Sequence, residues 1–163
     1  MNRKFVSAII SLFALNFSGV CYADILDGDG VLRSDDGSVR KMNLAEARSA
    51  CPAGTHLPTA REIAFFNQSL GARGILEIRQ APRGTPSGYI RITAVSFDGR
   101  KDEFYYSTSG YREPENDAFK WNWFWSSSIE KNLFGRAAIV QHGAGFLFES
   151  QQDSNAVRCF RNQ

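Results

Sequence analysis

Apolar residues at helical spacing follow two capping motifs in the first half of the chain. Asn43 is followed three residues later by Glu46, and Thr59 is followed in the same way by Glu62. In such a capping box each side chain bonds the other residue's backbone N–H, and apolar residues three and four positions apart then form one buried helix face. A Pro-Ala-Gly segment ends the first pattern and Gly71 ends the second. The sequence therefore predicts two helices, over residues 43–51 and 59–70.

After residue 88 the pattern changes to short segments typical of strands, separated by Gly, Asp and Asn turns. Alternation over residues 121–125 places the three tryptophans on one side of a strand and Asn122 and Phe124 on the other, and we expect Trp125 to pack in the core. A short hairpin is also expected around residue 36. The predicted strands are residues 31–33, 38–40, 89–97, 104–106, 121–128, 137–141, 146–149 and 156–160, and the last three form an antiparallel meander.

The first 23 residues have the pattern of a secretory signal peptide. Two basic residues precede an apolar run over residues 5–20, and Ala23 offers a small residue for cleavage. The run contains four polar residues and is shorter than the roughly 18–20 apolar residues of a membrane span. A lipid anchor on Cys21 is the alternative, although the preceding Ser-Gly-Val is a poor approach to a lipidated cysteine. We expect an exported protein, periplasmic or extracellular, whose mature chain (residues 24–163) forms one domain with no membrane span.

The composition allows one ordinary hydrophobic core and argues against a nucleic-acid partner. The chain has 163 residues, of which 43% are hydrophobic, and this suits a single domain. Removing the predicted leader takes away two basic residues and no acidic ones, which leaves 17 of each sign and a formal net charge of zero. Neutralising phosphates would need a local basic surface, for which the candidate is a group of six basic residues within residues 73–101. We interpret this group as a solvated face.

Two cysteines, Cys51 and Cys159, remain once the leader is removed. An exported protein meets an oxidising compartment, so that an even pair of cysteines predicts a disulfide. This bond would join the first helix to the last predicted strand. The alternative, a thiol nucleophile or a metal ligand, is less favoured because the mature chain has no third cysteine.

Four groups of residues occur in an order that resembles a known family. They are residues 43–47 with 51–54, residues 57–59 with Glu62, residues 125–128, and residues 157–161. This set is similar to that of the bacterial C-type-lectin-like domains typified by the C-terminal domain of collagen-like adhesins. The resemblance implies an α+β, C-type-lectin-like fold, in which two helices pack on a twisted antiparallel sheet, with one disulfide and with irregular loops that carry binding.

The chain also departs from this family. Members often have an arginine before the Leu-Pro pair, where this chain has His56, so a role of that arginine in bracing the second helix is not carried over. Residues 71–120 match no motif of the family. The collagen-like stalk of the adhesins is missing too, so trimerisation through it is not implied.

Aromatic residues are concentrated between residues 104 and 125, which hold nine of the 17 aromatic residues of the mature chain. Exposed aromatic side chains stack on sugar rings or anchor a protein partner, whereas buried ones form a core. We predict a glycan or a cell-surface protein as the ligand, bound through the loops of residues 73–123. The five predicted binding residues are Tyr111, Arg112, Trp121, Asn122 and Trp123.

Carboxylates and an asparagine within residues 113–117 suit a hard cation such as calcium. They precede the Trp-Ser-Ser-Ser strand, whereas the calcium loop of animal C-type lectins follows the corresponding strand, so we predict a solvated acidic loop. The acidic segment of residues 27–30 lacks the later ligands of a calcium loop and is predicted to be a turn. The sequence therefore predicts no metal and no cofactor.

The sequence offers little for an enzyme. His56 and His142 are the two histidines, and neither has a spacing that supports a triad with the serines of residues 126–128. We therefore predict a non-catalytic binding module. The alternatives are a structural or envelope-assembly protein without a discrete ligand and, as a weaker one, a secreted hydrolase.

Overall fold

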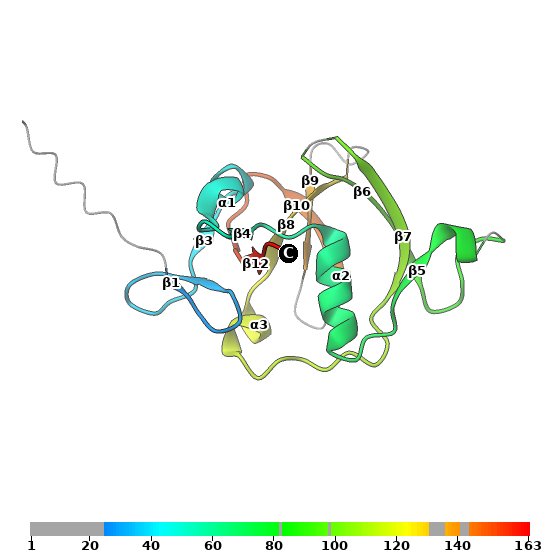
Figure 1. Cartoon of the computed structure of the whole chain (residues 1–163), viewed down its shortest axis with the longest axis horizontal. Helices are drawn as coiled ribbons and strands as arrows, with labels where there is room; N and C mark the ends of the chain where they lie inside the picture. Colours follow the sequence, from blue (N-terminus) through cyan, green and yellow to red (C-terminus); the bar gives the residue numbers. More distant parts are fainter. Residues whose placement is uncertain (1–24, 82, 98, 131–135, 141–143) are drawn as a thin grey trace, which may run out of the picture.

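The computed structural model of the protein describes residues 25–81, 83–97, 99–130, 136–140 and 144–163 (Figure 1). The predicted signal peptide, including Cys21, and the second histidine, His142, lie outside these ranges. No helix within the described ranges combines the length and hydropathy that a membrane span requires.

Both predicted helices are present, and each begins with the predicted capping box. The Asn43 side chain accepts a hydrogen bond from the N–H of Glu46, and the Glu46 carboxylate accepts one from the N–H of Asn43. Thr59 and Glu62 make the same pair of bonds at the next helix. The α-helices of the described residues are Leu44–Ala50 (α1), Ala60–Ser69 (α2) and Asp117–Trp121 (α3), with a 3-10 turn at Ile78–Gln80 (η1).

The third helix corrects the prediction of two helices and of a strand that begins at residue 121. The side chain of Asn116 caps α3 by accepting the N–H of Ala118 at 2.9 Å. Five residues are too few for an apolar period to show in the sequence, and α3 is stabilised by the burial of Ala118 and Phe119. Trp121 therefore ends a helix, and the three tryptophans do not alternate along one strand.

The main sheet is mixed, which corrects the prediction of an antiparallel sheet. Its path is β10-β9-β8-β6-β7-β5, in which all neighbours are antiparallel. The strand β11 pairs with β3 in the antiparallel sense and with the start of β8 in the parallel sense. The strands are β3 (Lys41–Met42), β5 (Gly74–Glu77), β6 (Ile90–Val95), β7 (Lys101–Ser107), β8 (Phe124–Ile129), β9 (Arg136–Val140), β10 (Phe146–Ser150) and β11 (Asn155–Ala156).

The parallel pairing arises because the chain does not continue the meander after β10. The antiparallel pairing of β9 with β10 confirms the first part of the predicted meander. The chain then turns at residues 151–153 and returns on the other side of β8, where Ala156 is paired with Phe124. The predicted strand over residues 156–160 is thus divided between β11 and a separate strand, Phe160–Arg161 (β12), which pairs with Thr55–His56 (β4).

The predicted disulfide is confirmed: Cys51, which ends α1, is bonded to Cys159, with 5.6 Å between the Cα atoms. Cys159 lies in a hydrophobic cluster with Leu44, Val157 and Trp125. Trp125 is fully buried as predicted, and its Nε1–H donates to the Met42 carbonyl oxygen at 2.6 Å. A second buried cluster lies between α2 and strands β6, β7 and β10.

Figure 1 shows how these parts are arranged around α2. Strands β5, β6 and β7 lie on one side of this helix. On the other side lie α1 and the small pairs, β4 with β12 and Ile25–Leu26 (β1) with Leu32–Arg33 (β2). The loop between β7 and α3 passes below α2 and brings α3 close to the C-terminal segment.

Candidate ligand-binding site

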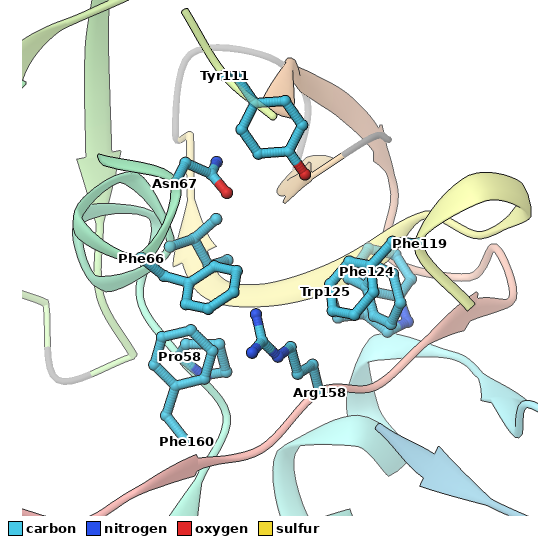
Figure 2. Close-up of a pocket in the computed structure, with 10 residues that line it drawn as sticks. Pro58, Phe66, Asn67, Tyr111, Phe119, Phe124, Trp125, Arg158 and Phe160 are labelled. Carbon is cyan, nitrogen blue, oxygen red and sulfur yellow. The ribbon is translucent and has the colours of Figure 1, made fainter. Parts of the chain in front are cut away.

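An aromatic cavity lies between α2, the loop before α3, the start of β8 and the C-terminal segment (Figure 2). Its free volume is about 20 Å³, which is room for about one water molecule. Three polar side chains also line it, those of Asn67, Tyr111 and Arg158. Six rings form most of its wall, those of Phe66, Tyr111, Phe119, Phe124, Trp125 and Phe160.

The guanidinium of Arg158 lies at the centre of this cavity (Figure 2). Its Nε–H donates to the Asp29 carbonyl oxygen at 2.7 Å. Its Cζ lies 3.7 Å from the ring centroid of Phe66, 4.9 Å from that of Phe119 and 5.0 Å from that of Phe160. Among the described residues, no carboxylate forms an ion pair with Arg158, and its two terminal nitrogens bond to no acceptor.

Burial of this cation is reflected in its acidity. Desolvation by burial lowers the pKa of Arg158 to about 10, although the negative charges of Asp29 and Asp27 act in the opposite direction. The group is still charged at neutral pH. A desolvated charge without a paired counter-charge is costly, and such groups are concentrated at functional sites.

Asn67 presents a hydrogen-bond acceptor to the cavity. Its side chain is 2% exposed, and its Nδ2 donates to the Tyr106 hydroxyl at 2.9 Å. The Tyr106 hydroxyl donates its own proton to the Ala144 carbonyl oxygen at 3.0 Å, so its oxygen must accept a bond from Asn67. This fixes the orientation of the amide, and Oδ1 points into the cavity (Figure 2). Burial raises the pKa of Tyr106 to about 12, so this hydroxyl stays protonated.

Tyr111 supplies the third polar group, and its hydroxyl points into the cavity (Figure 2). Burial raises the pKa of Tyr111, the charge of Glu113 raises it further, and the charge of Arg158 opposes both. The hydroxyl is therefore neutral and able to donate, and it bonds to no other described residue. Its backbone is held against the end of α2 by two hydrogen bonds, Arg73 N–H to Ser109 O at 2.7 Å and Arg112 N–H to Leu70 O at 2.9 Å.

An open cleft of about 470 Å³ adjoins the cavity and shares three of its residues, Phe66, Arg158 and Phe160. The turn of residues 27–30 and Arg161 form other parts of its wall. The predicted turn is confirmed, because the Asp27 carboxylate accepts the backbone N–H groups of Asp29 and Val31 at 3.0 and 2.9 Å.

The structure brings only Tyr111 of the five predicted binding residues into the cavity. Arg112 is exposed next to it. Trp121 is 79% exposed at the end of α3. Asn122 is buried and its Nδ2 donates to the Ala118 carbonyl oxygen at 2.9 Å, while Trp123 is half-buried against the core cluster of Trp125.

Sequence reasoning missed Arg158 and Asn67 as site residues. Arg158 belongs to one of the motifs that carry the family resemblance, but within that motif a role was predicted only for Cys159. Asn67 lies four residues after Ile63, on the apolar face of α2, where a polar residue breaks the pattern. That break was the available signal for Asn67. Arg158 had no such signal, because two of the rings around it, Phe66 and Phe119, come from distant segments.

The first histidine and the serines of β8 have structural partners. His56 Nε2 is 2.8 Å from Glu62 Oε1, and its Nδ1 is 2.8 Å from Asn162 Oδ1. Burial lowers the pKa of His56, but the bonds to Glu62 and Asn162 outweigh it, and the net pKa is raised. The serines of residues 126–128 are buried, and Ser128 Oγ accepts the N–H of Ala60 in the first turn of α2 at 3.0 Å. No hydrogen bond joins His56 to a serine in the described part of the chain.

The charged segments of the sequence are found at the surface. Glu113, Glu115 and Asp117 are exposed, and Asp117 pairs with Lys120. Within the ranges that the structure describes, no three His, Cys, Asp or Glu side chains are grouped as metal ligands would be. All six basic residues of the segment 73–101 are exposed, which agrees with a solvated face.

Comparison with protein-family models gives no match for this chain, and comparisons with curated proteins and with solved structures give none either.

Proposed function

We propose that the protein is an exported, non-catalytic binding module that holds its ligand at the aromatic cavity around Arg158. One observation carries this proposal: a half-buried guanidinium with two unbonded terminal nitrogens lies among aromatic rings, with no carboxylate paired to it in the described residues. A ligand that carries a negative charge would supply the missing partner. The site adjoins an open cleft, through which a ligand can approach.

The C-type-lectin-like architecture is part of this proposal. It is supported by the two capped helices and by the disulfide that joins α1 to the C-terminal segment. The loops that approach the cavity, before α3 and at residues 27–30, are irregular, as binding loops on such a domain would be.

Binding is favoured over catalysis by the chemistry of the three polar groups. Arg158 is a permanent cation, Asn67 offers an amide oxygen, and Tyr111 is a neutral phenol because its pKa is raised. None of these is a base or an activated nucleophile at neutral pH. They suit recognition of a ligand's polar groups, with the rings contacting its apolar part.

The test is to screen the purified mature protein against a glycan array and a peptide array, and then to measure each hit with variants. We expect Arg158→Gln to abolish binding of the true ligand and Arg79→Gln, which removes an exposed arginine from η1, to leave it unchanged. Thermal unfolding and thiol titration would establish that both variants fold. Hits that bind the folded Arg158→Gln protein as tightly as the wild type would contradict the proposal.

Trp121 favours a second candidate function, recognition of a neutral glycan by stacking. It is 79% exposed, and an exposed indole is a platform for a sugar ring. We expect Trp121→Ala to change the free energy of unfolding by less than about 0.5 kcal/mol and to abolish binding of a glycan hit if this candidate is right. A protein with no hit in either array, and no effect of either variant, would indicate a structural role in the envelope.

A further inference from the structure

We infer that the cavity takes the C-terminal residue of a peptide, with its carboxylate on Arg158, its backbone N–H on Asn67 and its apolar side chain among the rings. This inference rests on the proposed function and gives the ligand of that site a chemical class.

The state of Arg158 points to a carboxylate. Its Nε is occupied by the Asp29 carbonyl oxygen, which leaves the edge formed by the two terminal nitrogens for a ligand. Two parallel bonds from that edge match the two oxygens of a carboxylate. The carboxylates of Asp27 and Asp29 lie near enough to affect its pKa, and their charge disfavours a doubly charged group such as a phosphate. A single negative charge fits better.

Asn67 requires a donor on the same ligand. Its Oδ1 is an acceptor whose orientation is fixed by Tyr106 and Ala144, so it would repel a carboxylate and bind an N–H. The C-terminal residue of a peptide carries a carboxylate and an N–H on one Cα atom. The neutral hydroxyl of Tyr111 can donate a further bond to the carboxylate.

The walls distinguish a peptide from an acidic sugar. Apart from the three polar groups, the cavity is lined by rings and aliphatic side chains. A uronic acid would bring hydroxyl groups against these rings without hydrogen-bond partners, which is unfavourable. The side chain of a C-terminal phenylalanine or leucine would instead gain from contact with Phe66, Phe119 and Phe160.

The ligand must widen the cavity as it enters. The free volume of about 20 Å³ holds only about one water molecule, whereas the adjoining cleft of about 470 Å³ has room for the preceding peptide residues. Tyr111 is a half-buried residue of the cavity wall whose side chain can move, since its hydroxyl bonds to no described residue. Rotation about its side-chain bonds therefore breaks no hydrogen bond, while the backbone contacts of Ser109 and Arg112 keep the loop in place.

The test uses titration calorimetry of the disulfide-bonded mature protein with acetyl-Gly-Gly-Gly-Phe as the free acid and as the carboxamide. The two peptides differ in charge at one group and hardly in shape. Hydrogen bonds to a charged group predict that the acid binds about ten to a hundred times more tightly than the amide. The same acid with serine in place of phenylalanine, and free glucuronic acid, are expected to bind at least tenfold more weakly.

Variants assign this preference to the named groups. Arg158→Gln should remove the preference for the acid, while Arg79→Gln should keep it. Tyr111→Phe should fold normally, because the hydroxyl that it removes bonds to no described residue. It should weaken binding of the acid peptide severalfold. Tyr106→Phe removes the hydroxyl that orients the Asn67 amide. It should weaken binding of the acid peptide and of the amide peptide by the same factor, which a loss of charge recognition cannot produce. If Arg158→Gln does not fold, the affinities of the wild type and of Tyr111→Phe for the acid and amide peptides still test whether the cavity binds a C-terminal carboxylate.

The outcomes separate this inference from the proposed function. Equal binding of acid and amide, or binding of neither, overturns the assignment of a peptide C-terminus. If an array hit nevertheless depends on Arg158, the proposed function stands with another ligand class. If no ligand depends on Arg158, both are overturned.

Discussion

Loss of the Cys51–Cys159 disulfide is expected to be the most damaging single covalent change to the fold. The bond joins residues that are 108 positions apart in the sequence. It ties the end of α1 to the segment between β11 and β12. A cross-link over a loop of this length restricts the unfolded chain strongly, so that its removal should favour unfolding.

The size of the effect can be worked from the loop length. For 108 residues, the chain-entropy relation gives about 4.8 kcal/mol at 25 °C, and this is an upper figure because residual structure in the unfolded state reduces it. The free energy of unfolding of a single domain is about 5–15 kcal/mol. At this upper figure, the bond would supply between about a third and nearly all of the stability. With a urea m-value of about 2 kcal/mol/M, the unfolding midpoint should fall by about 2 M.

The assay is urea unfolding of the mature protein, followed by tryptophan fluorescence, with and without a reductant. Thiol titration of the denatured protein should find no free thiol before reduction and two after it. The double variant with Cys51→Ala and Cys159→Ala is the control for packing, because Cys159 is buried beside Val157 and Trp125. The variant should be less stable than the reduced protein by the small packing loss alone.

Two results would refute the reasoning. Free thiols in the unreduced, exported protein would show that the bond does not form in the native molecule. An unchanged midpoint after complete reduction would show that the cross-link does not restrict the unfolded state, and the stability would then have to come from the core clusters alone.

Three further changes test local features of the fold. His56→Ala should lower the urea midpoint most between about pH 5 and 6.5 and least at pH 8. The raised pKa of His56 gives stability that is complete below the unfolded value of about 6.5 and is lost as pH rises through the folded value. At acid pH the effect ends where Glu62, whose pKa is lowered, becomes protonated. Gly37→Ala should cost about 1–2 kcal/mol of left-handed strain. Gly30→Ala should cost more, since both glycines have φ near +80° but only at Gly30 would a Cβ lie 2.5 Å from a backbone oxygen. Trp125→Phe should cost about 2–4 kcal/mol in urea unfolding, because it leaves a cavity and removes the hydrogen bond from the indole to the Met42 carbonyl oxygen. A smaller loss would mean that the core repacks.

Local signals account for the parts of the fold that could be predicted from the sequence. Each capping box spans only four residues of the chain, and each was predicted together with its helix. The disulfide followed from the number of cysteines and the expected compartment, without knowledge of the fold. The burial of Trp125 was predicted from its position next to the serine motif in an expected strand.

The parts that could not be predicted depend on contacts between distant segments. The parallel pairing of β11 with β8 joins Ala156 to Phe124 and has no local signature. The pairing of β5 has no local signature either. This strand pairs with β7, which lies about 30 residues later in the chain, and β6, the hairpin partner of β7, lies between them in the sequence. The sequence of four residues in β5 is too short to be distinguished from a loop.

Of the residues that line the candidate cavity, only Tyr111 was among the predicted binding residues. An aromatic residue in a polar loop is visible in the sequence, whereas its surroundings are not. Arg158 meets Phe66 from α2 and Phe119 from α3, which are separated from it by 92 and 39 positions. Nothing in the sequence around Arg158 distinguishes it from an exposed arginine. Only the tertiary structure shows that this cation is half-buried and that Asn67 lines the same cavity.

The position of Arg158 between Val157 and Cys159 leads to a final prediction about stability and binding. Its two neighbours are buried in the core, so Arg158 points to the other side, into the cavity. Burying a cation without a paired carboxylate is costly, whereas its contacts with three rings return only about 2 kcal/mol if they act as one cation–π site. Arg158→Met should therefore keep or raise the urea midpoint while it abolishes binding of the acid peptide. A loss of more than about 2 kcal/mol in the free energy of unfolding would instead identify Arg158 as a structural cation held by its aromatic neighbours, because a residue retained for packing is one whose removal the fold cannot tolerate.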